Sequence, residues 1–125
     1  MIMCWESKIK PELQTAKEDI VVYKVALLTE TGIESLFQKF HYKLGCVYKM
    51  PELILLKQDC YRVEEGFHSY NTYKDAFQLC LSCSFTWILG ATYYVLKCII
   101  PKGSKYYKNR KETVSDTIII KDILT

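Results

Sequence analysis

The residues best suited to chemistry are a histidine and the short segment around it. His68 lies between Gly66, which permits a tight or left-handed turn, and Asn71-Thr72, where a helix is predicted to begin. The free amide groups at a helix start attract anions. A glycine, a histidine and a helix start in this order are typical of a ligand-binding corner, in which Tyr70 would take part. The alternative is that His68 only forms a hydrogen bond within the turn.

A second set of candidates is a basic, tyrosine-rich segment near the C-terminus. Residues 66–111 contain seven basic residues and one acidic residue, whereas residues 1–65 contain nine basic and ten acidic residues. Cations beside aromatic rings suit phosphate contacts and base stacking. The residues that we assign to this site, together with His68 and Tyr70, are Lys102, Lys105, Tyr106, Tyr107 and Arg110. The alternative is a solvated hairpin whose lysines keep the protein soluble.

Cys80 and Cys83 have the two-residue spacing of half a zinc site or of a redox pair. No second Cys-x-x-Cys pattern and no His-x-x-x-His pattern is present, so the other cysteines and histidines would have to complete a metal site from a distance. We therefore expect no metal and no cofactor. The six cysteines are expected to be mostly reduced and to act as small apolar residues.

The sequence has no glycine-rich phosphate loop and none of the common motifs of metalloproteases, hydrolases or dinucleotide-binding enzymes. We therefore expect a non-catalytic protein that binds an anionic, nucleotide-like small molecule. A protein–protein interaction module that uses the hairpin as an exposed strand edge remains open, as does a homo-oligomer. Nucleic acid fits less well as a partner, because the net charge of the whole chain is only +3.

The elements that would position these residues form one small domain. The 125 residues, of which 50% are apolar and 25% charged, fit a single α+β domain over residues 1–125. We expect a mainly antiparallel twisted sheet with one or two helices packed on it, and residues 1–18 as an N-terminal arm or loose cap. Residues 20–28 predict a central strand covered on both faces, and residues 71–81 predict a helix whose stripe Tyr73, Ala76, Phe77 and Cys80 docks on the sheet. Further strands are predicted at 51–56, 59–64, 91–100, 105–108 and 113–124.

Two segments of the chain fit more than one kind of structure. Residues 32–44 fit both a helical and a strand period, and we favour a strand. The longest apolar stretch, residues 85–100, contains polar interruptions and is shorter than the ~20 residues of a membrane-spanning helix. The N-terminus has no secretory pattern. We therefore expect no membrane contact and a cytoplasmic protein.

Three segments carry a resemblance to other proteins: 19–25 with its Tyr-Lys pair, 66–70 with its Gly-x-His corner, and 98–109 with its Ile-Pro-Lys-Gly hairpin, followed by 114–120. Together they resemble a loosely defined group of small uncharacterised proteins from phages, gut bacteria and large viruses. The resemblance covers most of the chain. It implies an accessory protein, such as a phage would encode to sequester a host immune signal, located in the host cell cytoplasm.

A fainter similarity is to the ADP-ribosyltransferase fold. In that family a basic residue or histidine on the first strand, an aromatic residue or serine, and a glutamate near a late strand surround nicotinamide dinucleotide. The similarity implies a transferase in which His68, Tyr70 and either Glu112 or Asp116 take these roles. The order of the residues departs from the family pattern, because the Gly-x-His corner lies in the middle of the chain and no Glu-x-Glu is present.

Overall fold

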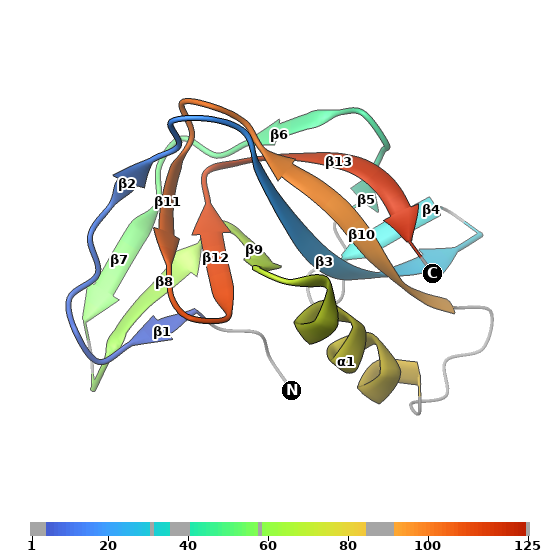
Figure 1. Cartoon of the computed structure of the whole chain (residues 1–125), viewed down its shortest axis with the longest axis horizontal. Helices are drawn as coiled ribbons and strands as arrows, with labels where there is room; N and C mark the ends of the chain where they lie inside the picture. Colours follow the sequence, from blue (N-terminus) through green and yellow to red (C-terminus); the bar gives the residue numbers. More distant parts are fainter. Residues whose placement is uncertain (1–4, 31, 36–40, 58, 85–91, 125) are drawn as a thin grey trace.

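The computed structural model describes residues 5–30, 32–35, 41–57, 59–84 and 92–124. They form a large twisted antiparallel sheet, a small three-stranded sheet beside it, and the helix α1 (Tyr73–Ser84), which lies against the large sheet (Figure 1). The prediction of a mainly antiparallel sheet with a helix packed on it is confirmed, and strands outweigh helix in the described residues. In this part of the chain no helix is long and apolar enough to cross a lipid bilayer.

The two sheets have different strand orders, and all their pairs are antiparallel. The small sheet has the order β1-β8-β7, and its strands are β1 (Glu6–Ser7), β7 (Ile54–Lys57) and β8 (Tyr61–Glu65). The large sheet has the order β2-β11-β12-β9-β3-β10-β13-β6, and β4 and β5 branch from β3. Its strands are β2 (Gln14–Thr15), β3 (Ile20–Thr29), β4 (Gly32–Ser35), β5 (His41–Tyr42), β6 (Val47–Lys49), β9 (Phe67–Tyr70), β10 (Thr92–Ile100), β11 (Lys105–Lys108), β12 (Glu112–Ser115) and β13 (Thr117–Leu124).

Strand β3 is the centre of the large sheet. It pairs with β10 at nine positions, from Ile20 to Leu28. Its inner face, with Val22 and Ala26, joins the main apolar core. Its outer face packs Val25 beneath α1. The prediction of a central strand covered on both faces is confirmed, and the preference for strand over helix in residues 32–44 is confirmed where the structure describes them.

The helix begins as predicted. The Thr72 hydroxyl accepts a hydrogen bond from the backbone amide of Asp75 (3.3 Å) and donates one to its carboxylate (3.1 Å), which caps the first turn. Ala76 and Cys80 of the predicted stripe are buried against the sheet, and Phe77 packs beside them. Leu79, which was not predicted, completes this contact.

Two expectations need correction. The predicted strand 113–124 is interrupted at Asp116, because this buried carboxylate accepts hydrogen bonds from the Lys105 amide (3.1 Å) and the Thr117 hydroxyl (2.9 Å) and turns the chain between β12 and β13. The arm is not a loose cap: β1 and β2 attach it to β8 and β11. Trp5, 0% exposed, packs on Tyr107 between the two sheets.

Gly66 shows why the corner before His68 needs a glycine. Its φ is +155°, and a Cβ added there would lie 2.4 Å from Val114 Cγ2 and 2.8 Å from Leu53 Cδ2. We expect Gly66→Ala to lower the free energy of unfolding by about 2 kcal/mol, through overpacking and backbone strain. Urea unfolding measures the change. Gly45→Ala is the matched control, because Gly45 also has a positive φ (+79°) but has nothing within 4 Å of the added Cβ. Equal decreases in the free energy of unfolding for the two variants would show that contact with Val114 and Leu53 is not the cause.

Candidate functional site

Strand β3 changes its partner on one edge, and the change creates a fork in the sheet. Tyr23 pairs with Tyr70 of β9, the one register position that joins β3 to β9, whereas Ala26 pairs with Ser35 of β4. Between these positions Lys24 has no register partner on this edge among the described residues. We call this place the β3 fork and define it by four residues whose side chains or backbone meet there. These are Lys24, Tyr42, His68 and Cys98.

Lys24 is the cation of the fork. Its side chain lies on the inner face of β3 between Val22 and Ala26 and is 8% exposed. Its Nζ donates a hydrogen bond to the backbone carbonyl of His68, which bridges the gap between the diverging strands. In the described part of the chain no carboxylate forms an ion pair with Lys24. Burial lowers the pKa of Lys24 from 10.5 to about 8, so the side chain is mostly a buried ammonium group at pH 7.

The imidazole of His68 is neutral. Burial, together with the charge of Lys24, lowers the pKa of His68 from 6.5 to about 4. Its Nδ1 atom is buried and has no hydrogen-bond partner among the described residues. A buried polar atom without a partner costs free energy, so this nitrogen is an open hydrogen-bonding position.

Tyr42 and Cys98 complete the fork without adding charge. The Tyr42 ring centroid lies 5.9 Å from Lys24 Nζ, within cation–π range, and burial raises the pKa of Tyr42. Burial likewise raises the pKa of the Cys98 thiol to about 12. Of the four residues that define the fork, Lys24 alone carries a charge at pH 7.

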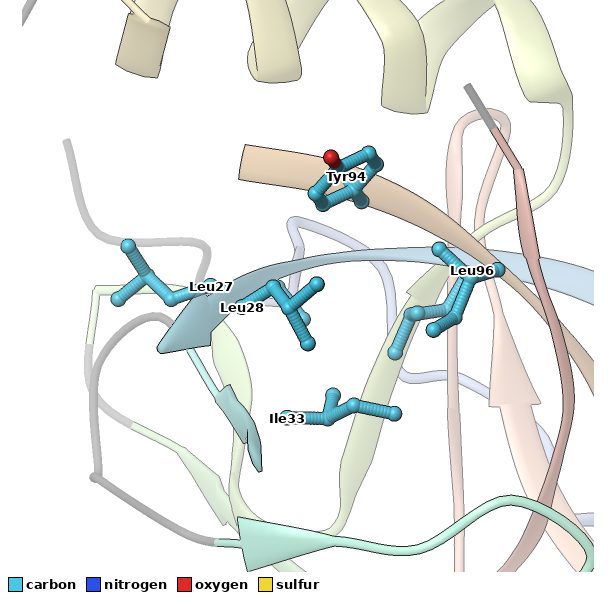
Figure 2. Close-up of a pocket in the computed structure, with 7 residues that line it drawn as sticks. Leu27, Leu28, Ile33, Tyr94 and Leu96 are labelled. Atoms are coloured by element: carbon cyan, nitrogen blue, oxygen red, sulfur yellow. The ribbon is translucent and has the colours of Figure 1, made fainter. Parts of the chain in front are cut away.

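A half-open apolar hollow lies on the sheet beside the fork (Figure 2). Its lining consists of Ala26, Leu27, Leu28, Ile33, Tyr94, Leu96 and Ile123. Leu96 is the register partner of Lys24, and Ala26 follows Lys24 on the same face of β3. Ile33 is the register partner of Tyr42. The side chains that line it leave no room for a water molecule, so it is not a formed ligand pocket.

The predicted basic hairpin is exposed but does not converge on one point. Lys102 lies in the turn between β10 and β11, Arg110 lies in the turn between β11 and β12, and both are exposed. Strand β11 separates them by four residues, which corresponds to roughly 13 Å at the usual strand rise. Lys105 is also exposed, and its Nζ donates to the Thr15 hydroxyl (2.5 Å). The structure therefore does not bring Lys102 and Arg110 to one small ligand.

The two hairpin tyrosines are mainly structural. Tyr107 is 7% exposed, and its ring centroid lies 5.8 Å from that of Trp5. The register places Tyr107, Val114 and His68 in one row across β11, β12 and β9, so hairpin and histidine do share a face, but this face is covered. The Tyr106 hydroxyl donates to Gln14 Oε1 (3.1 Å), and its ring packs against the main core. Tyr107 therefore lies in a covered apolar cluster, whereas the Tyr106 hydroxyl is at the surface.

Tyr70 and Glu112 lie directly opposite each other on β9 and β12. Burial and the neighbouring Glu112 raise the pKa of Tyr70 to about 12, and burial raises the pKa of Glu112. His68, Tyr70 and Glu112 thus share one face of two strands, as the transferase alternative requires. Asp116, the other acidic candidate, is occupied by its hydrogen bonds in the corner after β12.

The cysteine pair lies on α1. Cys80 is buried and Cys83 is half-buried, and burial raises the pKa of both thiols. Cys46, Cys60 and Cys98 are also free thiols, whereas Cys4 lies outside the described residues. In the part of the chain that the structure describes, no three histidine, cysteine or acidic side chains lie close enough together to hold a metal ion.

Sequence reasoning did not include Lys24 in the site, and it missed Tyr42. A signal for Lys24 was present, because a single lysine interrupts an otherwise apolar strand that is covered on both faces. Tyr42 had no such signal, since it lies in the segment with two competing periods. Comparisons of the chain with models of protein families, with curated proteins and with solved structures returned no match.

Proposed function

We propose that the protein is a non-catalytic binding protein for a small anionic molecule, whose negative group lies against Lys24 in the β3 fork. The observation that carries the proposal is the buried ammonium group of Lys24, which has no carboxylate partner in the described residues. An unpaired buried charge is unfavourable, and a bound anion would supply the missing partner where the low dielectric strengthens the attraction.

The surroundings of Lys24 limit the ligand. The side chains next to Lys24 on its face of the sheet are apolar, and the buried Nδ1 of His68 is a polar atom without a hydrogen-bond partner among the described residues. Ligands with a phosphate or carboxylate on a small ring or chain meet these conditions. A nucleotide would place its phosphate at the fork, and the exposed cations Lys102, Lys105 and Arg110 remain candidate contacts for larger ligands of this class.

Titration calorimetry with inorganic phosphate, small carboxylates, mononucleotides, cyclic nucleotides and ADP-ribose tests the proposal. We expect at least one of these ligands to bind with a micromolar Kd, which corresponds to about 8 kcal/mol. Lys24→Met should weaken this binding at least tenfold, because it removes the cation. Lys121→Met, at an exposed position of β13 outside the candidate site, is the matched control and should leave the Kd within about twofold. No heat from any ligand, or equal affinity for both variants, would contradict the proposal.

A further inference from the structure

We propose that β6 is a docking edge, at which an extended peptide segment of another protein adds one antiparallel strand to the large sheet. The segment has an apolar residue opposite Val47 and an acidic residue opposite Lys49. The inference goes beyond the proposed function, because β10 and β13 separate β6 from β3 and its Lys24.

The open backbone edge of β6 supplies the hydrogen bonds. β6 is the last strand in the order of the large sheet, and among the described residues its strand partner is β13 alone (Figure 1). The Met50 amide, directly after β6, donates to the backbone carbonyl of Asp116 (2.7 Å). Hydrogen-bonded pairs alternate along antiparallel strands, so the backbone groups of Tyr48 face β13 and those of Val47 and Lys49 face outward. The amides and carbonyls of Val47 and Lys49 are therefore placed to pair with a further strand.

An apolar row across the sheet ends at this edge. Its members are register neighbours on β3, β10, β13 and β6, namely Val21, Ile99, Ile119 and Val47. Val21 shares its face of β3 with Val25, which packs beneath α1. The two ends of the row are not covered by α1, since Val21 is 42% exposed and Val47 is 60% exposed. An apolar residue of an added strand, opposite Val47, would extend the row and cover Val47 in part.

Lys49 determines the charge of the partner. It is exposed and lies two residues after Val47, so the two side chains share one face of the sheet. No carboxylate of the described residues forms an ion pair with Lys49. Opposite charges on directly opposed residues stabilise a strand pair, whereas like charges destabilise it. An acidic residue is therefore favoured opposite Lys49, and in an antiparallel segment it precedes the apolar residue by two positions.

The other end of the large sheet lacks these features. Its terminal strand β2 has two polar residues, Gln14 and Thr15. Their side chains already accept hydrogen bonds from Tyr106 (3.1 Å) and Lys105 (2.5 Å). This edge offers an added strand no apolar side chain, which distinguishes β6 as the docking edge.

The test titrates the isotope-labelled full chain with two synthetic peptides, Thr-Glu-Thr-Val-Thr and Thr-Lys-Thr-Val-Thr, up to millimolar concentration. Amide NMR signals of Val47 and Lys49 should shift, and the glutamate peptide should bind at least about threefold more tightly than the lysine peptide. Lys49→Glu should reverse this preference. Lys74→Glu, the same change of charge at an exposed position of α1, should leave the preference unchanged.

Val47→Pro tests the backbone pairing. It removes an outward amide that β13 does not use, so it should abolish the binding of both peptides. Should Val47→Pro fail to fold, Val47→Asp serves as the second variant, and it should weaken the binding of the glutamate peptide at least about threefold.

Three results would overturn the proposal. The first is the absence of any shift at β6 with either peptide, and the second is binding without a preference for charge. The third is a dimer in sedimentation equilibrium that Val47→Pro dissociates, together with no peptide binding, which would assign the edge to a second copy of the chain.

Discussion

Lys24→Met is expected to raise the free energy of unfolding at pH 7 by about 1–3 kcal/mol. The pKa of Lys24 falls from 10.5 to about 8 on folding, so holding the charged form in the core costs about 3 kcal/mol. Methionine has a similar length and no charge. It leaves the His68 carbonyl without its hydrogen-bond donor, and this loss offsets part of the gain in the free energy of unfolding. Urea unfolding of both proteins measures the difference. Lys105→Met, at an exposed position, should change the stability by less than about 0.5 kcal/mol.

The pH dependence gives an independent check on the same lysine. The unfolded chain keeps the Lys24 proton up to about pH 10.5, whereas the folded protein keeps it only up to about pH 8. The free energy of unfolding therefore rises with pH between these values, and this gain is lost again as the pH falls from 10.5 to 8. Tyr42 and Cys98 titrate in the same range with the opposite sign. The curve of the variant is therefore subtracted from that of the wild type. A flat difference between pH 8 and 10.5, or a variant that is less stable at pH 7, would contradict the assignment.

A lysine that lowers stability in the core is explained if the fork is a binding site. Functional sites commonly retain groups that reduce the stability of the fold. A bound anion would stabilise the charged form of Lys24 and raise its pKa, so ligand binding and stability are linked through this one side chain. The same linkage means that Lys24→Met should produce a protein that is more stable but binds less.

Elements with strong local patterns were predictable from the sequence. β3 has a run of β-branched and apolar residues, and α1 has Thr72 followed by Asp75, a pair that caps a helix without help from the rest of the chain. The corner at Asp116 was not predicted, although Ser115, Asp116 and Thr117 are polar residues of the kind that favours turns. In the structure the Asp116 carboxylate accepts hydrogen bonds from the neighbouring Thr117 hydroxyl and from the distant amide of Lys105, and the second of these depends on the tertiary fold. Likewise, the burial of Trp5 depends on the small sheet, in which β1 pairs with the distant strand β8.

The candidate site was predictable only in part, for a similar reason. The exposed charges of the hairpin are visible in the sequence, whereas the burial of one lysine depends on how β9 and β4 share an edge of β3. That sharing is a nonlocal property of the fold. His68 was selected from the sequence as a candidate ligand-binding residue, and in the structure its backbone carbonyl lies beside Lys24, whereas the hairpin cations Lys102 and Arg110 lie beyond the two ends of β11.

His68 is expected to make the protein sensitive to acid. Its pKa is about 4 in the folded protein and about 6.5 in the unfolded chain, so the unfolded chain binds the proton first as the pH falls. The stability that the neutral imidazole contributes is fully present above pH 6.5 and is lost as the pH falls from 6.5 to 4. We expect a loss of about 2 kcal/mol, less than the full shift of the pKa implies because the side chain is only partly buried.

Unfolding of the wild type and of His68→Gln, measured at intervals from pH 7 to pH 4, tests this expectation. Carboxylates also titrate in this range, Glu112 with its raised pKa among them, so the relevant quantity is again the difference between the two curves. His41→Gln is the matched control, since the His41 side chain is 56% exposed. The difference should appear for His68→Gln and be much smaller for His41→Gln. Parallel curves for wild type and His68→Gln would show that the imidazole is solvated and would remove His68 from the fork.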